Sequence, residues 1–349
     1  MLIISGEEVK QTLSMQASLE AVEKAYLDLG RDRAVNRQRT DSWVPADNGR
    51  DYYLLKSMDG VAPGLKIGAV RVNSNLVTWR SYAGGLVKAG SGKRYVGLVM
   101  LFDMTDGEPL ALFPDEHIQA VRVGATTGLA IKYLAGGEIG RAAVIGSGRQ
   151  ANTAIEALCC LRKPREIAIY SPNEGRRAAL AAKFAGLGQN TVTAPSMESA
   201  VEGADMILFC TSSITPVCRP EWVVPGRFIS CVKYAEVGNQ VLSKSGFVVV
   251  NAHSGSPVNY LPGRSSFASH DPLEELGVAR GQAGPGQEEA DWTVYPELAR
   301  VVAGTAGKPD RGQSSLFINT IGLGIQFAAV GAVVYAGARK LGLGIEAPL

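Results

Sequence analysis

The chain has 349 residues, which is enough for two domains that each bury a hydrophobic core. Its 35 basic and 33 acidic residues nearly balance and form no long basic run, so nucleic-acid binding is not expected. Five cysteines without a metal-ligand spacing and three dispersed histidines argue against a metal site, and they favour reduced thiols in a cytoplasmic protein without a signal peptide.

The N-terminal third changes from a helical to a strand pattern. Apolar residues recur at helical spacing over 17–30, which predicts an amphipathic helix. Residues 51–113 instead contain apolar runs separated by turn signals, a pattern typical of a mostly antiparallel sheet. The clearest of these strands are expected at 51–55, 66–72 and 95–103.

The middle of the chain alternates between strand and helix patterns. After a long helix expected over 118–134, short apolar runs alternate with helical stretches, as in a doubly wound parallel sheet. Strands are expected at 142–146, 166–170, 205–209, 227–232 and 247–251, with helices at 152–162 and 175–186.

A glycine-rich turn joins the first of these strands to its helix. The residues are Gly146, Ser147, Gly148, Arg149, Gln150 and Ala151, with the Gly-x-Gly-x-x-Ala spacing of a dinucleotide-binding turn. Gly146 allows the tight turn, Gly148 lets the backbone approach a pyrophosphate, and Ala151 lets the helix pack closely on the strand. The helix N-terminus would then face the phosphate charge, although an ordinary strand–turn–helix is the alternative.

The end of the second strand bears on which nucleotide binds. NAD-binding proteins usually carry an acidic residue there for the ribose hydroxyls, whereas this chain has Ser171, followed by Asn173, Arg176 and Arg177. A hydroxyl and two guanidinium groups can bind a 2′-phosphate, so we expect NADP(H) to be preferred over NAD(H). In the alternative interpretation Glu174 takes the place of the acid and the arginines are solvated.

The C-terminal part contains one more cofactor loop and a long apolar segment. Cys210, Thr211 and Ser212 follow a strand and are expected near the cofactor at the carboxyl edge of the sheet. Residues 254–314 are rich in Gly, Pro, Ser and charge and are expected to be largely irregular, apart from a helix near 295–303. The apolar helix expected from about residue 316 should be buried rather than membrane-spanning and should return to the β-rich part.

Four features, by their order and spacing, make the chain resemble the ornithine cyclodeaminase/μ-crystallin family over nearly its whole length. In chain order they are Gly107-Glu-Pro-Leu-Ala111, Ile118-Gln-Ala-Val-Arg-Val-Gly-Ala125, the fingerprint at 146–151 and Gly322-Leu-Gly-Ile-Gln326. The resemblance implies an α/β protein with a Rossmann-type doubly wound parallel sheet over 118–314. It also implies a discontinuous β-rich domain, antiparallel or mixed, over 1–117 and 315–349 that binds the substrate and forms a homodimer.

The resemblance further implies basic side chains that hold the carboxylate of a small imino or amino acid. Arg39 and Arg122 match two of the family's basic residues, and either Arg71 or Lys66 matches its lysine. In a regular strand Lys66 and Arg71 would point to opposite faces, so both cannot easily reach one ligand.

The chain departs from the family at two acidic positions. Ala235 stands where cyclodeaminases carry an aspartate that works on protons, and either the adjacent Glu236 replaces that acid or the role is absent. Gln326 and Phe327 occupy the region where many members have a late-helix carboxylate, which argues against ornithine as the substrate.

We therefore expect an NADPH-dependent reductase or dehydrogenase that transfers hydride to the C=N carbon of a small α-imino acid, or to the C=O carbon of an α-keto acid. Arg122 would help to hold the substrate against the nicotinamide, and Glu236 is the candidate for proton transfer. The alternatives are a redox-neutral cyclodeaminase that uses bound NAD(P) and an NADPH-binding protein of the crystallin type without turnover.

Overall fold

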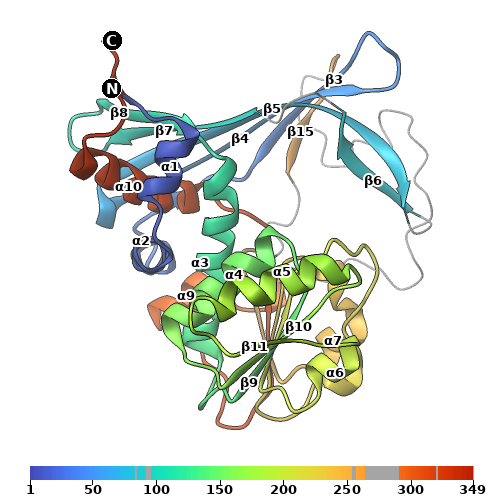
Figure 1. Ribbon diagram of the computed structural model, residues 1–349. Coiled ribbons are helices and arrows are strands. Elements are labelled where there is room, and N and C mark those ends of the chain that lie inside the picture. The colour runs from blue at the N-terminus through green and yellow to red at the C-terminus, as the bar shows by residue number, and fades with distance from the viewer. Residues whose placement is uncertain (83–84, 92–95, 254–256, 264–290, 320, 349) are drawn as a thin grey trace.

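Two sheets, each flanked by helices, make up the molecule (Figure 1). The structure, a computed structural model, describes residues 1–82, 85–91, 96–253, 257–263, 291–319 and 321–348. Helix α3 (Glu116–Leu134) runs from the upper sheet of Figure 1 down to the lower one. Much of the segment expected to be irregular, residues 254–256 and 264–290, lies outside the described residues.

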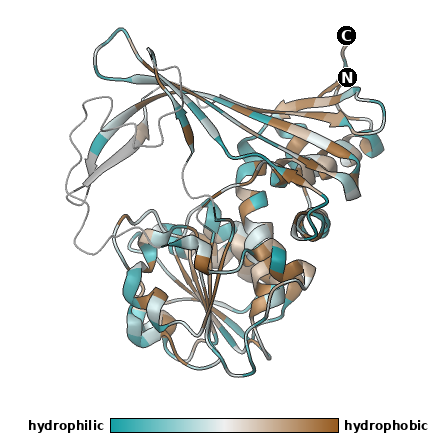
Figure 2. Cartoon of the chain, turned by 180° about the vertical axis from the view of Figure 1, so that it is seen from behind, coloured by the Kyte–Doolittle hydropathy of each residue, from teal (hydrophilic) through white to brown (hydrophobic). Residues whose placement is uncertain are grey.

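The lower sheet is parallel throughout, with the order β11-β10-β9-β12-β13-β16-β14 among the described residues. Its strands are β9 (Arg141–Ile145), β10 (Glu166–Tyr170), β11 (Thr191–Thr193), β12 (Met206–Phe209), β13 (Phe228–Cys231), β14 (Phe247–Val250) and β16 (Ser315–Ile318). Helices α4 (Arg149–Leu161), α5 (Glu174–Ala185), α6 (Met197–Val201) and α7 (Gly238–Lys244) flank it. Buried on both faces, the central strands are nearly continuous apolar runs, brown in Figure 2. The Rossmann-type parallel sheet predicted from the sequence is confirmed.

The apolar segment that starts near residue 316 differs from the prediction. Instead of one helix it forms β16 (Ser315–Ile318), which lies between β13 and β14, and then α10 (Gly324–Leu341). The chain therefore leaves the parallel sheet after Ile318 and not at residue 314. A short apolar run fits a buried strand as well as a buried helix, and here pairing with two neighbouring strands decides between them.

The upper sheet is mixed, with the order β15-β3-β4-β5-β7-β8-β1-β17 in the described part of the chain, while β2 and β6 pair with β4 and β5. Its strands are β1 (Leu2–Ile3), β2 (Val35–Asn36), β3 (Thr40–Pro45), β4 (Tyr52–Ala62), β5 (Ile67–Tyr82), β6 (Gly85–Gly90), β7 (Val96–Asp103), β8 (Pro109–Pro114), β15 (Val258–Tyr260) and β17 (Ile345–Glu346). Because β1 pairs with β17, both chain ends belong to this sheet, and N and C lie side by side in Figure 1. Strand β15 joins it from within the segment that was expected to belong to the Rossmann domain.

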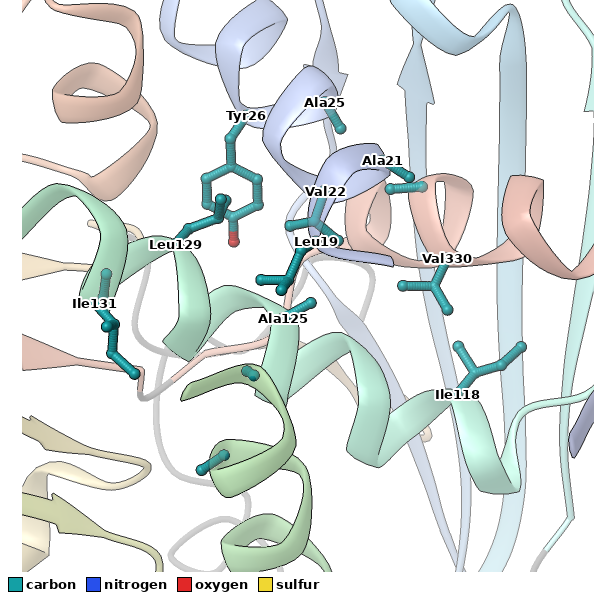
Figure 3. Close-up of a cluster of buried hydrophobic side chains, with 14 of the residues drawn as sticks. Leu19, Ala21, Val22, Ala25, Tyr26, Ile118, Ala125, Leu129, Ile131 and Val330 are labelled. Carbon is teal, nitrogen blue, oxygen red and sulfur yellow. The ribbon is translucent and has the colours of Figure 1, made fainter. Parts of the chain in front are cut away.

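Helices α1 (Gly6–Thr12), α2 (Met15–Gly30) and α10 cover one face of the upper sheet. Val22 and Tyr26 of α2 pack with Leu129 of α3 and Val330 of α10 in a fully buried cluster (Figure 3). The start of α10 lies directly on β4, since a Cβ atom on Gly324 would stand 2.1 Å from the Asp59 carbonyl oxygen. Helix α9 (Leu298–Ala303) packs against α2. Among the described residues we find no helix that combines the length and the apolar character needed to cross a membrane.

Candidate active site

A cleft of about 600 Å³ lies at the carboxyl edge of the parallel sheet. It is lined by the loops that follow β9, β10 and β12. The predicted cofactor residues that line it are Gly146, Ser147, Gly148, Arg149, Gln150, Ser171, Arg176, Cys210, Thr211 and Ser212. The lining also includes residues that the sequence analysis did not name as cofactor-binding, which are Ile145, Tyr170, Pro172, Met197, Ser213 and Val217. Thus three loops that are distant in the sequence form one cavity.

The glycine turn combines a tight backbone conformation with open space at the start of α4. Gly146 has φ 125°, and a Cβ atom there would stand 2.4 Å from the Cys210 carbonyl oxygen. A Cβ atom on Gly148 would instead enter open space, and no described side chain caps α4, which begins at the next residue. Ala151 is fully buried where α4 packs on the sheet. The residues therefore fit a dinucleotide phosphate held by backbone N–H groups at a helix N-terminus.

The two arginines after β10 have different surroundings. Arg176 lines the cleft, whereas the Arg177 guanidinium donates a hydrogen bond to the Ser171 carbonyl oxygen at 3.0 Å and pairs with Glu174. Asn173 accepts a hydrogen bond from the Arg176 backbone N–H at 2.9 Å and so caps α5. Of the four residues expected to bind the 2′-phosphate, Ser171 and Arg176 face the cleft. Asn173 and Arg177 instead make hydrogen bonds within the loop after β10.

Three basic residues of the sequence analysis come together on the inner face of the upper sheet. Met58 of β4 is opposite Arg71 of β5. Arg39 directly precedes β3, and the first residue of β3 pairs with the residue of β4 that adjoins Met58. Arg71 and Arg122 both lie against the ring of Phe327, with guanidinium carbons 5.4 and 5.3 Å from its centroid. The tertiary structure thus brings Arg39, Arg71 and Arg122 to one region.

Acidic and amide side chains orient these arginines. The Arg71 Nε donates a hydrogen bond to Asp115 Oδ2 at 2.7 Å, and both side chains are buried. Arg39 makes two hydrogen bonds to the carboxylate of Asp41, at 2.8 and 3.0 Å. Buried charges need such partners, because an isolated ion in the interior is strongly destabilising.

Lys66 lies outside this group. It follows the short helix η1 (Pro63–Leu65) in a left-handed conformation and is exposed. Its side chain lines a different cavity, together with Tyr335 and Lys340 from the second half of α10. Between the two residues that the sequence left open, the structure therefore places Arg71, and not Lys66, beside Arg122.

The sequence profile of the ornithine cyclodeaminase/mu-crystallin family matches residues 3–340. The chain belongs to this family. It is 25% identical to a Delta(1)-pyrroline-2-carboxylate reductase of Bacillus cereus, over 99% of this chain and 98% of the relative. It is also 25% identical to an NAD(P)H-dependent anabolic L-arginine dehydrogenase of Pseudomonas aeruginosa, over 96% of both chains.

A solved structure of a similar enzyme has the same fold over the whole chain. The Delta(1)-pyrroline-2-carboxylate reductase of Thermococcus litoralis, in complex with NADH and L-proline, superposes with a TM-score of 0.74 and 26% identity, over 99% of this chain and 100% of that one. The enzyme class predicted from the sequence, an NAD(P)-dependent oxidoreductase that acts on C–N bonds, is confirmed.

This member of the ornithine cyclodeaminase/mu-crystallin family has one more basic residue on the inner face of the upper sheet, which the sequence analysis did not name. Lys56 of β4 is opposite both Asp41 of β3 and Asn73 of β5, two buried residues on the inner face of the sheet. Lys56 itself is half-buried between the inward-facing Leu54 and Met58. A lysine in the apolar alternation of a strand was the signal that could have revealed it.

Glu236, the expected proton-transfer residue, is fully buried. Its carboxylate accepts hydrogen bonds from the backbone N–H and the hydroxyl of Thr211, at 2.6 and 2.7 Å, and from the backbone N–H groups of Val232 and Lys233, at 2.9 and 3.0 Å. Burial raises the pKa of Glu236, and these hydrogen bonds act in the opposite direction. The expectation that Glu236 replaces the missing acid does not fit this placement, because its oxygens are engaged in joining two loops.

Proposed function

We propose that this enzyme reduces the C=N bond of a small α-imino carboxylic acid with NADPH. The observation that carries the proposal is that Arg71 and Arg122 both lie against the ring of Phe327, while the helix that carries Arg122 packs on the helix that follows the glycine turn. Helix α3, which carries Arg122, lies directly against α4, since a Cβ atom on Gly124 would stand 2.6 Å from the side chain of Thr153. A substrate held by these guanidinium groups would thus be near the cofactor cleft.

The chain's own residues account for binding and orientation. Arg71, Arg122 and the more exposed Arg39 supply charge-assisted hydrogen bonds to the substrate carboxylate, which places the imine carbon for reaction. The backbone of Gly146–Gly148 and the start of α4 would hold the pyrophosphate, and the bound nicotinamide supplies the hydride. An imine that is already protonated needs little acid help, which agrees with Ala235 at the family's acidic position and with the inward carboxylate of Glu236.

The preference for NADP(H) over NAD(H) rests on Ser171 and Arg176. Ser171 accepts a hydrogen bond from the Ser147 hydroxyl at 2.9 Å and carries no charge that would repel a 2′-phosphate. The Arg176 guanidinium lies on the same cleft and can pair with that phosphate. Fluorescence titration with both reduced cofactors tests the preference, and tighter binding of NADH would refute it.

The outer face of the upper sheet supports the proposal of a homodimer. Leu55, Val70, Val72 and Leu98 are 36–41% exposed there. Val72 and Leu98 are directly opposite each other on neighbouring strands. Exposed apolar patches of this kind commonly mark a protein interface. Sedimentation of the wild type and of a Val72→Arg, Leu98→Arg variant tests the dimer, which should dissociate in the variant.

A substrate screen tests the activity. Delta(1)-pyrroline-2-carboxylate, other cyclic imino acids, and α-keto acids with added amines are each incubated with NADPH, whose oxidation is followed by absorbance. We expect one equivalent of NADPH to be consumed for each imine reduced. Ammonia release from an amino acid without net cofactor consumption would instead identify a cyclodeaminase, and cofactor binding without turnover would identify a binding protein.

A further inference from the structure

Gln326 is the centre of a buried hydrogen-bond network beneath the arginine cluster. Its Oε1 accepts hydrogen bonds from Arg122 Nη1 at 2.7 Å and from the Leu323 backbone N–H at 3.0 Å. Its Nε2 donates to the Tyr26 hydroxyl at 2.8 Å and to the Thr126 hydroxyl at 2.7 Å. Gln326 is fully buried, so these four bonds satisfy its amide within the protein.

The direction of each bond in this network is determined by its neighbours. The Tyr26 hydroxyl donates to Asn251 Oδ1 at 2.7 Å, and the Thr126 hydroxyl donates to the Arg122 carbonyl oxygen at 2.8 Å. Both hydroxyl protons are therefore used elsewhere, and each hydroxyl oxygen can only accept from position 326. An amide provides one accepting and one donating end, whereas an ionised carboxylate only accepts. The network therefore requires glutamine rather than glutamate.

The residues around Gln326 hold the Arg122 guanidinium in place from two further sides. A Cβ atom on Gly322 would stand 2.3 Å from Arg122 Nη1, so a larger residue there would displace the guanidinium from its present position. The Phe327 ring lies against the guanidinium, 5.3 Å from its carbon to the ring centroid. Figure 3 shows the Tyr26 ring, the next member of the network, extending from α2 toward Leu129 of α3. One short segment at the start of α10 thus shapes the position of Arg122.

We propose that Gln326 is a positioning residue for imine reduction. It orients Arg122 toward the substrate carboxylate through a neutral oxygen and adds no negative charge beside the guanidinium. The inference rests on the proposed function, in which Arg122 holds that carboxylate. A glutamate at this position would place a negative charge where the amide oxygen now lies 2.7 Å from Arg122, and it would weaken the attraction for the substrate whatever other contacts Arg122 makes.

The test compares Gln326→Glu with Gln11→Glu in steady-state kinetics at saturating NADPH, with Delta(1)-pyrroline-2-carboxylate or the imino acid found in the screen as the probe. Gln11 is exposed on α1, so its variant carries the same charge change at a distance from the arginine cluster. We expect the KM of the Gln326→Glu variant to rise roughly tenfold or more, with little change in kcat or in NADPH affinity, and no effect of Gln11→Glu. An unchanged or lower KM in folded Gln326→Glu would overturn the inference.

A second variant covers the case in which a buried glutamate prevents folding. Gln326→Met keeps the length of the side chain and its neutral charge but removes the bond to Arg122, so KM should rise severalfold. If that KM also stays at the wild-type value, Gln326 does not position Arg122. Arg122→Met separates this inference from the proposed function. If its KM is unchanged, Arg122 does not hold the substrate and the proposed function fails at that residue, whereas a raised KM there with no effect at position 326 refutes the role of Gln326 alone.

Discussion

The buried ion pair between Arg71 and Asp115 yields a prediction in which stability falls while substrate binding is kept or strengthened. Asp115 Oδ2 accepts hydrogen bonds from Arg71 Nε at 2.7 Å and from Gln119 Nε2 at 2.9 Å. The Asp115 side chain is 0% exposed and that of Arg71 7%. Asp115→Asn keeps the shape of the side chain but leaves Arg71 buried with less compensation for its charge. Since removing one partner of a buried pair typically costs about 3–5 kcal/mol, we expect a loss of about 3 kcal/mol, because the amide oxygen still accepts one bond.

An exposed pair of the same chemistry provides the control. Arg300 and Asp32 are 2.6 Å apart, but their side chains are 39% and 72% exposed. Asp32 has a left-handed backbone (φ 56°), which asparagine also tolerates, so Asp32→Asn changes the charge without backbone strain. Solvent screening makes such pairs weak, and we expect little change in stability.

Urea unfolding, followed by fluorescence and circular dichroism, measures both variants. The midpoint should fall clearly for Asp115→Asn and hardly at all for Asp32→Asn, at an unchanged slope. Equal losses in the two variants would refute the argument that burial gives the Arg71–Asp115 pair its value. The KM of the imino acid should stay constant or fall in Asp115→Asn, because a negative charge beside Arg71 has been removed. A large rise in KM would show that the pair is needed to aim Arg71.

Three further predictions concern the cofactor cleft. Gly146→Ala should lose stability as well as cofactor affinity, since φ 125° and a carbonyl oxygen 2.4 Å from the new Cβ atom strain the turn. Gly148→Ala should lose only cofactor affinity, because its Cβ atom enters open space. Thermal melts with and without NADPH distinguish the two variants. Ser171→Asp should weaken NADPH binding at least roughly tenfold and strengthen NADH binding, measured by fluorescence titration, and an unchanged ratio would place the 2′-phosphate elsewhere. Glu236→Gln should reduce cofactor affinity and stability together, because an amide cannot accept all four hydrogen bonds that now join two loops. An unchanged melting temperature with a selective loss of kcat would instead support Glu236 as the residue that transfers the proton.

Much of the fold could be predicted because its signals are local. The strand expected at 166–170 is β10 with the same bounds, and the glycine turn lies at the carboxyl end of β9 as its spacing indicates. Apolar alternation, helical periodicity and turn residues act over a few residues, so a sequence window contains them. The run at 315–318 was different, because it became a strand only through pairing with β13 and β14.

From the sequence alone we could predict the fold class, the dinucleotide turn and the residue types that can hold a carboxylate. Folding selects which of those residues meet: Arg71 and not Lys66 lies beside Arg122, Arg176 and not Arg177 faces the cleft, and Glu236 points into the interior. This is because a side chain's role depends on burial, charge and hydrogen-bond partners that distant segments supply. Gln326 illustrates this, since its amide bonds to residues 200 and 300 positions away in the chain.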